Sequence, residues 1–319
     1  MGGAAHSERQ HCDLVQQSRH ARALVALAAT VACLAFSAGA GASPSQLEQT
    51  GQLTMTSDAG DYIGQGGTYS YATPANVFFG TARSWAGENN LVSVTMRTDA
   101  ASTNYWILEF AAAPGQTLTP GTYSNVARVG SQATGQPGLD VSGMGRGCNG
   151  LTGSFTVSDA VFGPYGYVQS FHATFEQHCE GSGPALDGEV SVSNPPPPPP
   201  LSTQLTIAPT GQIGSHGSAN LSGTITCNRP VDPERSYIQL TVSQPAKTGT
   251  LTGAAAFAVP SNCSTTPSPW QATVTPEDPK SPFIKGSINV NAWVQVGDPF
   301  FDLLLTSGPV TATVTIREN

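Results

Sequence analysis

Six consecutive prolines at residues 195–200 set the strongest constraint on how this chain can fold. Proline lacks a backbone N–H and keeps φ near −65°, so such a run can join neither a helix interior nor a central strand. In polyproline II geometry six residues span ~19 Å and resist bending. We therefore expect a stiff linker between two domains, at residues 43–194 and 201–319. A docking site for a proline-recognising partner is the less favoured interpretation.

The four cysteines that follow residue 42 are divided evenly by this linker. Cys148 and Cys179 precede it, whereas Cys227 and Cys263 follow it. Paired cysteines are typical of small domains that fold in an oxidising compartment, so we predict one disulfide within each domain. Pairing between the domains is the alternative. Each predicted bond closes a loop of about 30 to 36 residues, which on the chain-entropy model stabilises a domain by ~3–4 kcal/mol.

Residues 1–42 have the pattern of a secretory signal peptide. A basic segment with Arg19 and Arg22 precedes an apolar stretch at residues 23–36 that is too short to span a bilayer. Small residues at positions 40–42 fit the rule for cleavage. The sequence therefore predicts a secreted protein, and no later segment is apolar enough to form a membrane span.

The composition after residue 42 excludes several classes of partner. Ten Lys and Arg stand against 19 Asp and Glu, which makes the chain acidic. Binding to nucleic acid or to an anionic membrane needs a cationic surface, so both partners are disfavoured. Gly, Pro, Ser and Thr are abundant and helix-periodic segments are lacking, which indicates an all-β fold.

Period-two alternation of apolar and polar residues marks strands in both domains. In the first domain, Trp106, Leu108 and Phe110 share one face of a strand. Roughly nine or ten strands there suit a β-sandwich of jelly-roll type. In the second domain, about seven strands in roughly 115 residues favour an immunoglobulin-like sandwich. Cys263 precedes the strand of Trp270, so we expect the second disulfide to tie a strand to a loop.

Three motifs of the first domain carry a resemblance to a known domain. They are GDYIGQG at residues 60–66, GRGCN at 145–149 and FEQHCEG at 175–181. Together they resemble an uncharacterised domain of secreted bacterial proteins. The resemblance implies a β-sandwich with a Cys148–Cys179 pair, and it implies no activity. The second domain resembles the small disulfide-bonded immunoglobulin-like modules of secreted bacterial proteins in its strand pattern and cysteine spacing.

Charged residues near these motifs have both structural and functional interpretations. Asp58 and Asp61 could supply oxygen ligands to calcium, although their spacing fits no defined calcium loop. Arg146 could capture an anion, but we expect it to pair locally with Glu176 or Glu180.

Histidine residues are the other candidates for chemistry. Outward positions on one strand hold His172, Thr174, Glu176 and His178. Glu176 and His178 would lie ~7 Å apart, close enough to share a zinc ion. With no third ligand the favoured interpretation is a solvated face, so we expect no metal and no cofactor. The histidines after residue 42, which include His216, lie in no context typical of a serine protease, and we assign no catalytic residue.

The candidate binding residues lie in the second domain. A strand at residues 288–296 buries its aliphatic side chains, so its alternate positions must point outward. An outward aromatic ring among amides suits a neutral polar ligand, because sugar C–H groups stack on the ring while amides bond hydroxyls. An ordinary polar strand surface is the alternative. The assigned residues are Trp293, Asn289, Asn291 and Gln295, with Tyr237 and Gln239 on the neighbouring strand.

These patterns predict a secreted, non-catalytic protein that binds or adheres at an extracellular surface. Its expected partner is a carbohydrate or another cell-surface component. A passive envelope or matrix component is the first alternative. The second is a polysaccharide-active enzyme, which would need two convergent carboxylates or a metal in a cleft.

Overall fold

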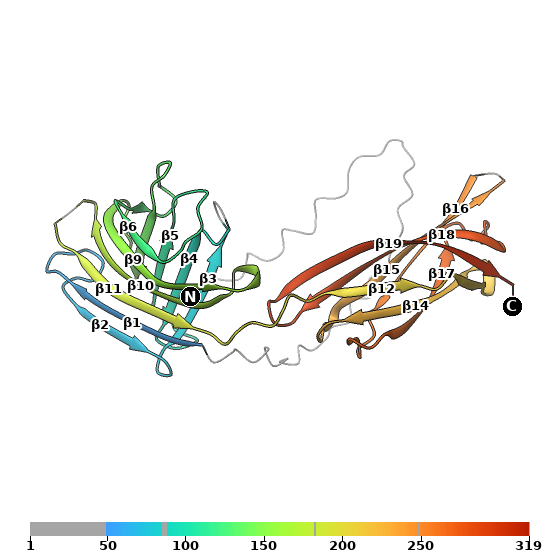
Figure 1. The fold of residues 1–319 in the computed structure, drawn as a ribbon, viewed down its shortest axis with the longest axis horizontal. Helices are drawn as coiled ribbons and strands as arrows, with labels where there is room; N and C mark the ends of the chain where they lie inside the picture. Colours follow the sequence, from blue (N-terminus) through green and yellow to red (C-terminus); the bar gives the residue numbers. More distant parts are fainter. Residues whose placement is uncertain (1–48, 85–87, 182, 248, 319) are drawn as a thin grey trace, which may run out of the picture. The chain divides into compact units, whose positions relative to one another are not determined.

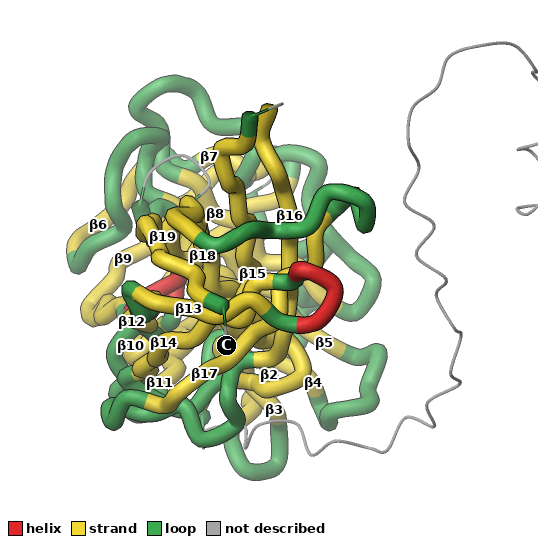
Figure 2. The backbone as a smooth tube through the Cα atoms, turned by 90° about the vertical axis from the view of Figure 1, so that its right-hand side faces the viewer, coloured by secondary structure: helices red, strands yellow, loops and turns green. Residues whose placement is uncertain are grey.

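The computed structural model describes residues 49–84, 88–181, 183–247 and 249–318. Over these ranges the chain is almost entirely β structure, which confirms the predicted all-β class. The helical segments, red in Figure 2, are two short 3₁₀ turns at Pro164–Gly166 and Ser215–Gly217. No helix within the described ranges is long and apolar enough to cross a membrane. The predicted signal peptide at residues 1–42 lies outside the described residues.

The described residues before the proline run form eleven strands, which we call the N-terminal β region (Figure 1). In chain order they are β1 (Thr50–Ser57), β2 (Thr68–Ala72), β3 (Val77–Arg83), β4 (Leu91–Arg97), β5 (Tyr105–Ala111), β6 (Gly121–Ser124), β7 (Ala127–Arg128), β8 (Gly138–Gly143), β9 (Leu151–Phe162), β10 (Val168–Cys179) and β11 (Leu186–Ser193). They make two sheets, ordered β2-β1-β11-β10-β9-β6 and β3-β4-β5-β8-β7. Consecutive strands are often neighbours in these sheets, so the jelly-roll comparison holds for the two-layer architecture and not for the strand order.

The two sheets pack face to face around one aromatic core. Trp106, Leu108 and Phe110 on β5 are fully buried, as their shared parity predicts. The ring of Phe110 lies 5.4 Å from Phe155 on β9 and 5.3 Å from Phe171 on β10. Such aromatic pairs stabilise a core by about 0.5–1.5 kcal/mol beyond the area that they bury. Alternating residues of both sheets therefore form a single sandwich core.

The described residues after the proline run form eight strands, which we call the C-terminal β region. They are β12 (Thr203–Ile207), β13 (Thr210–Ile213), β14 (Ala219–Cys227), β15 (Asp232–Ala246), β16 (Gly249–Ala258), β17 (Ser268–Pro276), β18 (Gly286–Asp298) and β19 (Leu303–Arg317). Seven of them close into a ring in the order β14-β13-β19-β18-β15-β16-β17, because β14 pairs with β17 as well as with β13. The predicted sandwich did not include this closure. A closed ring leaves fewer unpaired strand edges.

Both predicted disulfides are confirmed. Cys148 bonds Cys179 and Cys227 bonds Cys263, so each bond stays on its own side of the proline run. Cys227 ends β14 while Cys263 lies in the loop between β16 and β17, which confirms the expected strand-to-loop tie. Buried apolar residues also form two clusters, one in each β region. The division into two domains with a stiff proline linker stays a prediction.

Candidate functional site

The outer face of β15 and β18 carries the residues predicted to bind a ligand. Cross-strand register sets Tyr237 opposite Gln295 and Gln239 opposite Trp293. Together with Thr241 and Thr306, these four residues line a hollow of about 420 Å³. The structure therefore brings four of the six predicted residues together. The other two, Asn289 and Asn291, lie farther along β18.

The side chains of this hollow offer an aromatic surface beside hydrogen-bonding groups. Trp293 is half-buried, and Tyr237 is 39% exposed. The Tyr237 hydroxyl donates a hydrogen bond of 3.0 Å to Oε1 of Gln295, which holds both side chains against the sheet. None of the six lining residues is charged. The hollow is therefore suited to a neutral polar molecule.

A β-bulge on β19 lies beside Trp293. Ala292 pairs with Val310 and Val294 pairs with Ser307, so two residues of β19 lie opposite one residue of β18. One of the two is Gly308, with φ at 113°, and a Cβ there would lie 2.7 Å from the carbonyl oxygen of Ala292. A bulge bends its strand and changes where neighbouring side chains point. The bulge lies opposite Trp293, which is one of the six residues that line the hollow.

Farther along the same face, amides pair with hydroxyls. Asn289 lies opposite Thr313, and Asn291 lies opposite Thr311. The Thr313 hydroxyl donates to Oδ1 of Asn289 at 3.3 Å. Threonines of β19 therefore flank β18, and they extend the uncharged polar surface beyond the hollow.

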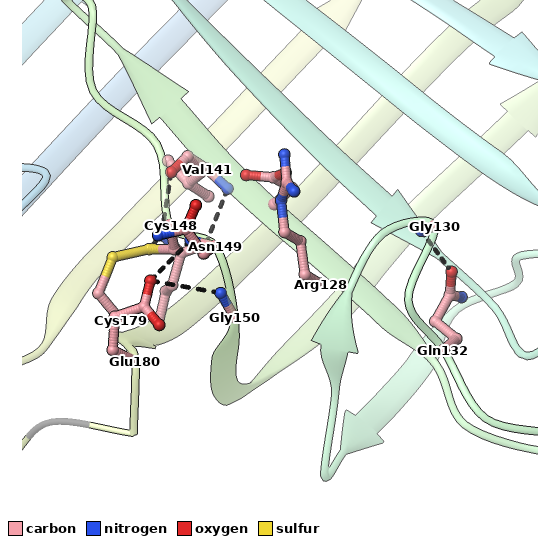
Figure 3. A network of polar contacts seen from close by, with 11 residues as sticks. Arg128, Gly130, Gln132, Val141, Cys148, Asn149, Gly150, Cys179 and Glu180 are labelled. Atoms are coloured by element: carbon pink, nitrogen blue, oxygen red, sulfur yellow. Dashed lines mark hydrogen bonds and ion pairs between the residues drawn. A yellow bond between two sulfur atoms is a disulfide. The ribbon is translucent and has the colours of Figure 1, made fainter.

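In the N-terminal β region, two of the motifs join the two sheets. Gln177 is 1% exposed, and its amide accepts from Val141 N at 2.8 Å and donates to Val141 O at 2.9 Å. Val141 belongs to β8 and Gln177 to β10. The Gln177 side chain therefore bonds both backbone groups of one residue in the opposite sheet. Beside it, Glu180 accepts bonds from the amides of Asn149 and Gly150, next to the disulfide (Figure 3).

Motif GDYIGQG forms a loop that is held by its own aspartate. Asp61 is 3% exposed and accepts hydrogen bonds from the Ser57 hydroxyl at 2.9 Å and the Gly64 amide at 2.6 Å. Asp58 accepts from the amide of Ala185 at 3.0 Å. These protein donors occupy the carboxylates that were candidate calcium ligands, which favours a structural role for both.

The predicted partner of Arg146 is wrong. Its Nε donates at 2.8 Å to the carbonyl oxygen of Ile63 in the GDYIGQG loop, and not to Glu176 or Glu180. Both acids have other partners, because Glu180 accepts bonds from the amides of residues 149 and 150 and Glu176 bonds His178. All three motifs thus meet through hydrogen bonds, and the charged residues support the fold.

Glu176 and His178 contact each other directly on β10. His178 Nε2 lies 2.8 Å from Oε1 of Glu176, and this bond raises the pKa of His178 above its usual value. Within the described ranges no group of three or more His, Cys, Asp and Glu could hold a metal ion. Nδ1 of His178 faces the carbonyl oxygens of Gly183 and Pro184, which favours a protonated, structural imidazole.

One pair of acids was missed by sequence reasoning. Glu109 on β5 and Asp140 on β8 are cross-strand partners. Asp140 is 8% exposed; its Oδ2 bonds Nε of Arg128 at 3.0 Å, and its Oδ1 is buried without a partner in the described part of the chain. Burial raises the pKa of both carboxyls, and the charge of Asp140 raises that of Glu109 further. Thirty residues separate them in sequence, so only the strand register reveals the pair.

Comparisons with known proteins return no match for this chain. No family model, no curated protein and no solved structure matches it. The resemblance of the three motifs to an uncharacterised secreted domain stays a prediction.

Proposed function

We propose that this is a secreted binding protein whose C-terminal β region binds neutral carbohydrate at an extracellular surface. The observation that carries the proposal is the hollow on β15 and β18, where Trp293 lies among uncharged amides and hydroxyls. A sugar presents apolar C–H faces and several hydroxyls at once, and this hollow has a group to match each. Two disulfides support folding in an oxidising compartment.

An immunoglobulin-like relationship of the C-terminal β region is part of the same proposal. Its support is the number of strands, their mostly antiparallel order and the buried Trp270 near the disulfide-bonded loop. Such modules present one sheet face or one set of loops to a partner. The proposed ligand lies on a sheet face.

The test is a glycan array probed with the protein and with Trp293→Ala. We expect the wild-type protein to bind neutral glycans and the variant to lose at least tenfold in affinity, because a buried aromatic contact of this kind contributes about 1.4 kcal/mol or more. Trp293→Phe keeps a ring and should retain part of the binding. Near-UV circular dichroism of each variant checks that the fold is intact.

A matched control lies elsewhere in the same β region. A second polar hollow, of about 700 Å³, is lined in part by Gln271, Arg317 and Glu318. Gln271→Ala should leave glycan binding unchanged. Equal binding by wild type and Trp293→Ala, or loss with Gln271→Ala alone, would contradict the proposed site. An array without any bound neutral glycan would favour the passive envelope component.

A further inference from the structure

Three neighbouring strands of the N-terminal β region bring a serine, a histidine and a glutamate into one line. Ser158 lies on β9, His172 on β10 and Glu189 on β11. Oγ of Ser158 lies 2.7 Å from Nδ1 of His172, and Nε2 of the same ring lies 2.6 Å from Oε1 of Glu189. Both contacts are within ordinary hydrogen-bonding distance.

Donor and acceptor rules assign the protons in this line. An ionised glutamate can only accept, so Nε2 of His172 carries the hydrogen that bonds Glu189. In the neutral ring Nδ1 then has a free lone pair and accepts the hydroxyl hydrogen of Ser158 at 2.7 Å, a shorter contact than the 3.3 Å from the same hydroxyl to the carbonyl oxygen of His172. A neutral imidazole that accepts from a serine while a carboxylate fixes its tautomer is the arrangement that activates a nucleophile. The two ring nitrogens are exchanged relative to the chymotrypsin-type arrangement, but their roles are the same.

Ser158 lies at a β-bulge. His172 pairs with Asp159 and Ala173 pairs with Val157, so Ser158 has no partner residue on β10. Bulges are frequent beside active sites because they change the direction of a side chain. Ser158 is exposed, and the side chains of His172 and Glu189 are 39% and 55% exposed. An external substrate can therefore reach the serine.

A second histidine of the same strand shows what a purely structural imidazole looks like. His178 bonds Glu176 through Nε2, while Nδ1 lies 3.1 Å from the carbonyl oxygen of Gly183 and 3.2 Å from that of Pro184. Because each nitrogen faces only acceptors, each carries a hydrogen when both bonds form. His178 is thus arranged as a cation and cannot take a proton. His172 faces one donor and one acceptor, which suits a base.

We propose that Ser158, His172 and Glu189 form a nucleophilic centre that hydrolyses carboxylic esters. This goes beyond the proposed binding function, does not depend on it, and departs from the expectation of a non-catalytic protein. The outer face of a sheet is open to water and lacks the preorganised donors of a deep oxyanion site, which contribute 10²–10³ in rate. The expected substrates are therefore esters with good leaving groups, and not amides.

The proposed reaction has two balanced steps. Oγ of Ser158 attacks the ester carbonyl carbon as its proton moves to Nδ1 of His172; the C–O bond then breaks and the alcohol leaves with that proton. Glu189 stabilises the imidazolium that forms in between. In the second step water attacks the acyl carbon, its proton passes to Nδ1, and the acid leaves as the proton returns to Ser158.

The test uses the secreted protein with p-nitrophenyl acetate and a fluorophosphonate probe, which phosphonylates activated serines. Wild type should take up the probe and hydrolyse the ester faster than buffer. Ser158→Ala should lose both signals, and His172→Gln should lower each at least 100-fold. Glu189→Gln should lower turnover about tenfold and keep Ser158 as the labelled residue.

His178→Gln is the matched control, since it alters the other histidine–glutamate pair of β10. It should leave ester hydrolysis and labelling within twofold of wild type. Ser158 and His172 are surface residues, so the variants should keep the near-UV circular dichroism of wild type. Wild-type hydrolysis no faster than that of Ser158→Ala, or equal labelling of both, would overturn the proposal. Glycan binding by these variants should be unchanged, which separates this test from that of Trp293.

Discussion

Polar side chains are used differently in the two β regions. In the N-terminal β region, Gln177 is buried and forms two hydrogen bonds with Val141 of the opposite sheet. In the C-terminal β region, Gln295 is half-buried on the outer face and accepts one bond from Tyr237. The first glutamine joins two layers of the fold, whereas the amide nitrogen of the second bonds no other side chain or backbone group in the described part of the chain.

This difference shows how little a distinctive motif says by itself about function. The three motifs of the N-terminal β region contain Asp, Glu, Arg and His, the residue types of many active sites. Most of these side chains bond backbone groups of the protein itself, as Asp61 and Arg146 do. The candidate binding face instead has an ordinary alternation of Asn, Gln and Thr around Trp293. The proposed catalytic line also lies outside the motifs, at Ser158, His172 and Glu189.

The largest expected effect comes from removing each disulfide. Replacing both cysteines of either pair by Ala should lower the free energy of unfolding by ~3–4 kcal/mol, because the closed loops of 31 and 36 residues are similar in length. Urea unfolding of the two double variants measures this. Cys148 Sγ also accepts a weak hydrogen bond from Gln177 at 3.6 Å. Removing the Cys148–Cys179 bond should therefore lower the free energy of unfolding by at least as much as removing the Cys227–Cys263 bond. If one double variant lost less than about 1 kcal/mol of unfolding free energy, the two disulfides would not be equally stabilising.

A matched pair of glutamine variants sharpens the comparison directly. Gln177→Leu should cost about 2–3 kcal/mol, since it leaves the buried N–H and C=O of Val141 without partners. Gln295→Leu should change stability by no more than about 0.5 kcal/mol, as is usual for surface positions. Thermal or urea unfolding reports both values. A similar loss of unfolding free energy in both variants would mean that the outer face of β15 and β18 is not a free surface.

The smallest expected effect concerns the acid pair of the N-terminal β region. Because the pKa values of Glu109 and Asp140 are raised, the folded state binds protons more tightly than the unfolded chain. Their ionisation therefore lowers stability as the pH rises from about 4 toward 7. Glu109→Gln removes one of two negative charges that face each other across the strands. It should therefore stabilise the protein by about 0.5 kcal/mol at neutral pH.

The control for this prediction is the pH itself. In acid, where the Glu109 carboxyl of the wild type is protonated and neutral, the difference between wild type and Glu109→Gln should disappear. Unfolding free energies measured at both pH values give the comparison. A destabilised variant at neutral pH would show that Glu109 is held by a favourable partner instead.

Local pattern was sufficient to predict much of the fold and the outline of the binding face. Alternation correctly placed Phe110 in the core, and it placed Trp293 and Gln295 on the outside of β18. Cysteine position correctly gave both disulfides. Local pattern could not predict the closure of the strand ring, the contact of Arg146 with Ile63, or the pairing of Glu109 with Asp140. Each of these depends on which residue of a distant strand lies alongside.

What the amino-acid sequence determined by itself is the β class, the side of each strand that is buried, and the cysteine pairs. The first two follow from the two-residue period of a strand, which is a local property. The cysteine pairs follow from the position of the cysteines relative to the proline run. Only the tertiary structure decided that Ser158, His172 and Glu189 meet, or that Tyr237 lies opposite Gln295. Those contacts require the register between strands, and a slip of one residue would turn every side chain of a strand to its other face. Register is set by turns, bulges and packing together, so the sequence of a single strand does not contain it.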